Sequence, residues 1–102
     1  KKNLKDYNGA IADYSKSIEL NPNHTKAYYN RGNAKSDLKD YYGAIADFTK
    51  AIEINPNDAG AYNNRSVSKE GIGDLNGACD DAKKAIKLGN TLSVKWVAEN
   101  CN

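Results

Sequence analysis

The chain has 102 residues, of which 39% are hydrophobic and 27% are charged, and its formal net charge at pH 7 is +2. This composition is typical of one globular domain with a modest core and excludes a disordered chain. So small a net charge does not favour nucleic acid or an anionic membrane as a partner, and no stretch of the sequence is apolar enough to span a membrane.

The first segment of the chain is repeated. Leu4–Asn23 recurs 34 residues later as Leu38–Asn57, with fifteen of twenty residues identical, and a more divergent third copy follows at Asp74–Leu88. A fixed period of this length predicts a solenoid, in which each unit buries its apolar face by stacking on its neighbours. Such architectures present an extended surface and rarely a catalytic pocket.

Each copy has an apolar face with helical spacing. In the second copy five residues form it: Ala44, Ile45, Phe48, Ala51 and Ile52. The first two copies end in Asn-Pro-Asn and the third in Gly89-Asn90, and these residues stop a helix. A second helical segment follows the first two copies, over roughly residues 25–38 and 59–72, and a shorter one follows the third. We therefore predict an all-α solenoid of antiparallel helix pairs.

These positions resemble the tetratricopeptide repeat (TPR), a 34-residue helix–turn–helix unit. The matching residues in the two full periods are Tyr28, Gly32, Ala44, Phe48, Ala51, Pro56, Tyr62, Ala78 and Ala85. The resemblance implies a right-handed superhelix of about two and a half repeats: a partial repeat over residues 1–24, complete repeats over 25–58 and 59–92, and a capping helix over 93–102 that packs through Trp96. The pentatricopeptide RNA-binding repeat has a period of 35 residues and fits less well.

The chain begins with Lys1 inside a repeat, so we expect a piece of a longer protein in which the end of a first helix precedes the second helix. The helix that would cover the first apolar face is therefore missing. That face consists of Ala10, Ile11, Tyr14 and Ile18. Two interpretations remain open: the face is exposed by truncation, or it stacks on the end of another molecule and continues the superhelix.

Charged residues also recur in register. Most TPR units carry an apolar residue just before the Gly32 position, but here that place is taken by Arg31 and, one repeat on, by Arg65. The opposite helices carry aspartates at the same place in each copy: Asp13, Asp47 and Asp81. The recurrence predicts an Arg–Asp pair that bridges helices once per repeat. The alternative is a row of arginines that binds an acidic ligand.

In TPR folds the first helices of successive repeats line a concave groove. The resemblance places seven residues there as candidates for peptide binding: Lys26, Tyr29, Asn30, Asn33, Asn63, Asn64 and Val67. The same projection exposes Asp37 and Glu70 on this surface. Asparagine side chains both donate and accept, so they suit the backbone of an extended peptide. The alternative is that these asparagines form hydrogen bonds between helices or are solvated.

TPR domains that bind the C-terminal carboxylates of chaperones use a clamp of Lys, Asn, Asn, Lys and Arg. Asn33 and Asn64 match the two asparagines of this clamp. Its three cations are replaced by Tyr29, Val94 and Ala98. Because a carboxylate would find no cation to pair with, the sequence does not favour chaperone tails as ligands.

Cys79 and Cys101 lack the spacing of a metal site, and Cys79 takes the core position of Ile11 in the repeat, so we expect two unreactive thiols rather than a disulfide or a zinc site. The one histidine, His24, falls in a turn and is expected to be solvated.

No nucleophile–base constellation or phosphate-binding loop is present. The sequence therefore predicts a non-catalytic scaffold that binds a protein or peptide, without cofactor or metal. The alternative is a structural spacer or an array that self-associates end to end.

Overall fold

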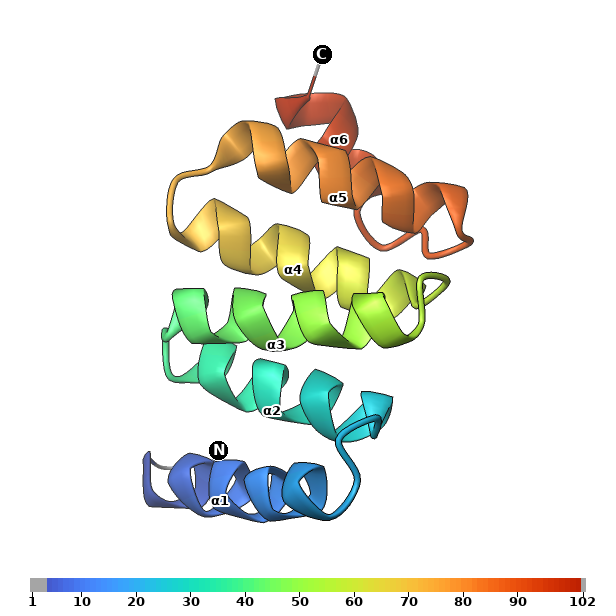
Figure 1. The fold of residues 1–102 in the computed structure, drawn as a ribbon. Helices are drawn as coiled ribbons and strands as arrows, with labels where there is room; N and C mark the ends of the chain where they lie inside the picture. Colours follow the sequence, from blue (N-terminus) through green and yellow to red (C-terminus); the bar gives the residue numbers. More distant parts are fainter. Residues whose placement is uncertain (1–3, 102) are drawn as a thin grey trace.

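The computed structural model describes residues 4–101, which form six α-helices and no strand. The helices are α1 (Leu4–Leu20), α2 (Thr25–Asp37), α3 (Tyr41–Ile54), α4 (Ala59–Gly71), α5 (Leu75–Lys87) and α6 (Val94–Asn100). They stack one on the next in chain order, from α1 at one end to α6 at the other (Figure 1). None of these helices combines the length and the apolar character that crossing a bilayer requires. The predicted all-α solenoid is confirmed.

The helix starts are set by side-chain caps. The carboxylates of Asp40, Asp58 and Asp74 each accept a hydrogen bond from the backbone N–H three residues later, which would otherwise lack a partner. His24 caps α2 in the same way, through Nδ1 and the N–H of Ala27 at 3.4 Å. His24 is exposed, as a turn residue should be, but it also has this local structural role.

The beginning of α1 differs from the expectation. We expected the end of a first helix ahead of the second one, yet the described chain is a single helix from Leu4 onward. The residues equivalent to its first turn form tight turns at Leu38–Asp40 and Ile72–Asp74, where Leu38 and Ile72 donate to the last carbonyls of the preceding helix.

The core between the helices is made largely of alanine. Ala44, Ala51, Ala61, Ala78, Ala82 and Ala85 have no exposed surface. Phe48 is the largest fully buried side chain, and it packs directly on Gly32, where an added Cβ would lie 2.8 Å from the ring. Small residues therefore let the helices approach closely around one aromatic ring.

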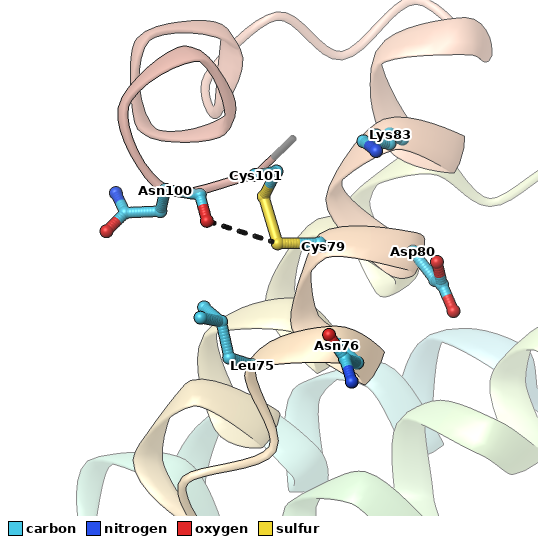
Figure 2. Close-up of a pocket in the computed structure, with 7 residues that line it drawn as sticks. All are labelled: Leu75, Asn76, Cys79, Asp80, Lys83, Asn100 and Cys101. Carbon is cyan, nitrogen blue, oxygen red and sulfur yellow. Dashed lines mark hydrogen bonds between the residues drawn. A yellow bond between two sulfur atoms is a disulfide. The ribbon is translucent and has the colours of Figure 1, made fainter.

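The cysteines correct a prediction made from the sequence. Cys79 is buried as expected, but it forms a disulfide with Cys101, and no cysteine is free (Figure 2). The helix α6 returns across α5 and brings the two Cα atoms to 5.8 Å, although the cysteines are 22 residues apart in sequence. That approach depends on the path of the C-terminal segment, so cysteine spacing alone does not reveal it.

Candidate functional site

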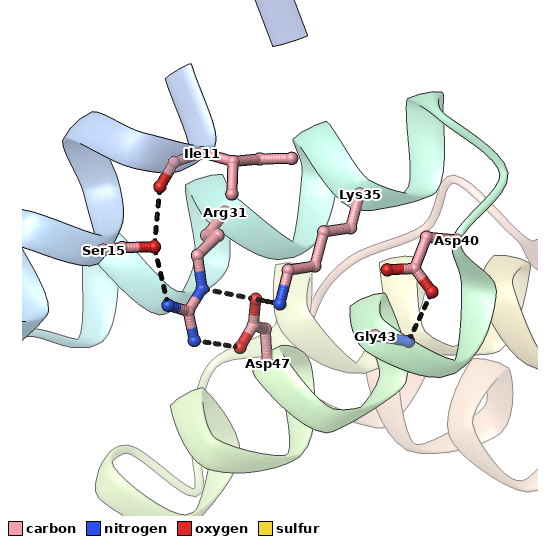
Figure 3. A network of polar contacts seen from close by, with 7 residues as sticks. All are labelled: Ile11, Ser15, Arg31, Lys35, Asp40, Gly43 and Asp47. Carbon is pink, nitrogen blue, oxygen red and sulfur yellow. Dashed lines mark hydrogen bonds and ion pairs between the residues drawn. The ribbon is translucent and has the colours of Figure 1, made fainter. Parts of the chain in front are cut away.

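The recurring charges form the first polar network, which joins α1, α2 and α3 (Figure 3). The guanidinium of Arg31 on α2 donates to both carboxylate oxygens of Asp47 on α3, at 2.8 and 2.7 Å. Its third nitrogen donates to the hydroxyl of Ser15 on α1 at 3.0 Å, and the ammonium of Lys35 lies 3.2 Å from Asp47. One arginine thus connects three consecutive helices.

The same network recurs one repeat later. Arg65 on α4 donates to both oxygens of Asp81 on α5 at 2.7 and 2.8 Å, and to the hydroxyl of Thr49 on α3 at 3.0 Å. Lys69 completes the group 3.0 Å from Asp81. The ring of Tyr62 lies beneath the guanidinium, 5.5 Å from its carbon to the ring centroid.

Both networks are internal to the fold. Asp47 and Asp81 are buried, and their hydrogen bonds with Arg31 and Arg65 raise the pKa of each guanidinium above its ordinary value. The arginines are therefore not a row offered to an acidic ligand. Asp13 is different: it is exposed on α1, and the position sixteen residues before it, where the repeat would place an arginine, lies ahead of residue 1.

The candidate groove lies along α2 and α4. A hollow of about 370 Å³ between these helices is lined by Asn33, Ser36, Asp37, Asn64 and Val67. A second hollow of about 230 Å³ lies nearer the N-terminal ends of the same helices, lined by Thr25, Lys26, Tyr29, Asp58 and Gly60. A third of about 120 Å³, between α1 and α2, includes Asn30. Six of the seven predicted groove residues line one of these hollows.

Asn63 is the exception, and its expected place in the groove is wrong. It is 7% exposed because the segment leading into α6 covers it. The oxygen of its side-chain amide accepts a hydrogen bond of 2.6 Å from the hydroxyl of Ser93. Its amide donates to Asn64 at 3.2 Å, and Asn64 in turn donates to the hydroxyl of Tyr29 at 3.0 Å and to Asn33 at 2.8 Å. Asn63 and Asn64 thus form the inter-helix hydrogen bonds that were the alternative to peptide contact.

Some polar groups along the groove are left without a partner inside the described chain. Within the described chain the side chain of Asn30 makes no hydrogen bond. The side chain of Asn33 makes only the one that its oxygen accepts from Asn64. Lys26 is exposed, and Val67 keeps 51% of its surface accessible. The groove therefore combines two available amides with one cation and one apolar side chain.

Residues 4–101 contain no group of three histidine, cysteine, aspartate or glutamate side chains placed to share a metal ion. The charged member of the groove besides Lys26 is Asp37, which the sequence also placed on this surface. Asp37 lines two of the three hollows, because it lies one turn beyond Asn33 on the same face of α2.

Family models match two overlapping parts of the sequence. One described as tetratricopeptide repeat matches residues 25–58, and one described as TPR repeat matches residues 3–39, so together they cover more than half of the chain. The chain belongs to the tetratricopeptide repeat family. No curated protein matches it.

Solved TPR domains have the same fold. The TPR domain of Arabidopsis OM64 is 30% identical, with a TM-score of 0.85 over 93% of this chain and 78% of that one. The second TPR domain of human RPAP3, solved with the HSP70 peptide SGPTIEEVD, is 26% identical, with a TM-score of 0.86 over 94% and 82% of the two chains. The TPR2B domain of yeast Sti1, solved in a pHsp70 complex, is 26% identical, with a TM-score of 0.83 over 93% and 79%. The chain is a TPR protein-interaction module.

Proposed function

We propose that this TPR chain is a non-catalytic scaffold that binds a segment of a partner protein in the concave groove of α2 and α4. The observation that carries the proposal is the pair of available amides, Asn30 and Asn33, on one face of α2 beside hollows of about 120 and 370 Å³. An amide that is not engaged within the fold can bind the backbone N–H and C=O groups of an extended peptide without demanding a particular sequence.

The other groove residues have supporting roles in this proposal. Tyr29 packs edge-to-face on Phe48, with the ring centroids 5.9 Å apart, and its hydroxyl is fixed by Asn64. That leaves a rigid aromatic wall in the hollow that also contains Lys26. Val67 supplies apolar contact, and Asn64 acts by holding Tyr29 and Asn33 in place.

Chaperone tails are not the partner that the groove favours. The RPAP3 neighbour was solved with a peptide ending in EEVD, which is acidic. In this chain the positions that would hold the cations of a carboxylate clamp are Tyr29, Val94 and Ala98, and the last two lie exposed on α6. Without cations a terminal carboxylate would lose its hydration with little in return.

The test is selection of a displayed random-peptide library on the folded wild-type domain, followed by affinity measurement for a recovered peptide by fluorescence anisotropy. We expect Asn30→Ala to weaken binding several-fold, because the peptide backbone loses a partner, and Asn8→Ala, an exposed change on α1, to leave it unchanged. Amide chemical-shift changes on peptide addition should fall on α2 and α4. Equal affinity for the wild type and Asn30→Ala, with shifts elsewhere, would contradict groove binding.

A further inference from the structure

We propose that the groove selects a partner segment with a lysine or arginine side chain, whose stem lies on Val67 and whose charged end pairs with Asp37. This preference presupposes the peptide binding proposed above and specifies the chemistry of the partner. The site is the hollow of about 370 Å³ between α2 and α4, in which Asp37 is the one ionisable residue.

The position of Asp37 makes its carboxylate receptive to a cation. Asp37 is the last residue of α2 and is exposed, and no hydrogen bond or ion pair is assigned to it within residues 4–101. A helix C-terminus carries partial negative charge from its unpaired carbonyls, so a carboxylate there is unfavourable until a cation approaches. A ligand cation would therefore relieve a repulsion as well as form a new pair.

Nearby cations do not neutralise this carboxylate. Lys35 and Lys69, in the last turns of α2 and α4, lie within 3.2 and 3.0 Å of Asp47 and Asp81, in the internal networks. Lys26 lies in the first turn of α2 and lines a different hollow. The Asp37 carboxylate is therefore the one charged group in the hollow, and neither Lys35, Lys69 nor Lys26 pairs with it.

Other acidic residues of the chain are engaged locally or lie elsewhere. Asp40, Asp58 and Asp74 cap helices, and Glu70 accepts a hydrogen bond of 3.2 Å from the indole of Trp96. Asp80 also lines a hollow, but it shares that hollow with Lys83 (Figure 2). Asp37 therefore differs from these residues in combining a hollow, an exposed position and no internal cation.

The rest of the hollow fits the same side chain. Val67 offers an apolar surface, 51% exposed, on which the methylene stem of a lysine or arginine can pack. The amide of Asn33 lines the same hollow and is placed to bind the ligand backbone. An acidic side chain in this place would meet Asp37 as a like charge, so the hollow also discriminates against acidic segments.

The experiment compares the peptides selected by the wild-type domain and by Asp37→Lys. Wild type should enrich lysine or arginine at one position of the recovered motif, and Asp37→Lys should enrich aspartate or glutamate there. For one recovered peptide, Asp37→Asn should weaken binding about fivefold, the upper range for an exposed ion pair. Replacing the lysine or arginine of that peptide with norleucine should weaken its binding to the wild-type domain by the same factor. The same replacement should not weaken binding to Asp37→Asn any further. The matched control is Glu53→Gln, which removes an exposed carboxylate from α3 without touching any of the hollows.

The outcomes separate the two proposals. Peptides that depend on Asn30 but show no cation preference would overturn this inference and leave groove binding intact. The same holds if loss of the peptide cation costs equally in wild type and Asp37→Asn. If no peptide is recovered, or if none depends on Asn30, both proposals are wrong. Circular dichroism melting of each variant shows that the comparison is made between folded domains.

Discussion

The fold leaves no room for a side chain at Gly32. A Cβ at this position would lie 2.8 Å from the ring of Phe48, which is itself fully buried and cannot move aside. We therefore expect Gly32→Ala to lower the free energy of unfolding by about 1–3 kcal/mol through overpacking, even though alanine is the better helix former. Urea denaturation measures the change.

Gly9 provides the matched control for this substitution. It lies within α1, and a Cβ there would meet nothing within 4 Å. Gly9→Ala should raise the free energy of unfolding by about 0.5–1 kcal/mol, because alanine loses less backbone entropy in a helix. If both substitutions are stabilising, the contact of Gly32 with Phe48 does not limit the fold.

The Arg65–Asp81 pair gives a second prediction at this scale. The two side chains are 16% and 6% exposed, so removing either partner leaves a charge with little water around it. We expect Asp81→Asn and Arg65→Met each to cost about 3 kcal/mol of unfolding free energy, and the double variant to cost clearly less than the sum. The exposed pair Lys50–Glu53 is the control and should show coupling below about 0.5 kcal/mol. Additive losses for Arg65 and Asp81 would show that they do not stabilise each other.

Residue roles were predictable from the sequence only where the repeat carries them. Arginine and aspartate recur together, so their pairing can be inferred from register alone. The burial of Asn63 could not be inferred in this way, because it depends on Ser93, which lies in a segment outside the regular repeats. Asp37 could be placed on the concave surface by its spacing on α2, but the repeat assigns it no role, since the equivalent residue in the next copy is Gly71.

At the scale of elements, α6 is the helix that packing secures least. It has seven residues and none is buried, whereas an isolated helix of this length is unstable in water. The disulfide between Cys79 and Cys101 closes a segment with a sequence separation of 22 and, by chain entropy, stabilises the fold by about 3 kcal/mol. The covalent link therefore substitutes for buried surface.

We expect Cys101→Ser to lower the free energy of unfolding by about 2–3 kcal/mol under oxidising conditions. Because α6 would detach from α5, the fluorescence of Trp96, the single tryptophan, should shift to longer wavelength. A reducing agent should change the wild type in the same direction and leave Cys101→Ser unaffected. A variant as stable as the oxidised wild type would show that contacts alone hold α6.

The helix boundaries could be predicted closely because their signals are local. Asn-Pro-Asn follows the last residue of α1 and of α3, and the capping aspartates mark the first residue of α3, α4 and α5. The disulfide could not be predicted, because two cysteines without a recognisable motif do not show whether the chain between them folds back and brings them together.

At the scale of the whole molecule, the outer faces of α1 and α6 (Figure 1) bear on whether copies of this 102-residue chain associate. The apolar residues of α1 are only half-buried, which would favour stacking on the α6 end of another copy. The repeat register opposes it, because Glu99 stands where Arg31 and Arg65 stand, and a continuing copy would bring Asp13 opposite it. Two carboxylates would then meet at the place where each internal junction has an ion pair.

We therefore expect this 102-residue chain to be monomeric by light scattering up to high concentration, and Glu99→Arg, which removes the repulsion from Asp13, to shift it toward association. Tyr14→Lys in the Glu99→Arg background is the control and should restore the monomer, because it places a charge in the apolar face of α1. A wild-type mass that rises with concentration would contradict this prediction.

Each of the two arginines crosses a boundary between repeats: Arg65 lies in one repeat with Asp81 and reaches Thr49 in the repeat before it. Linear arrays unfold piecewise when the coupling between neighbouring units is weak. Here a detached terminal repeat would leave a guanidinium or a hydroxyl without its partner across the boundary. The coupling is thus built into the same side chains that hold each helix pair together, and it favours an array that unfolds as one cooperative unit.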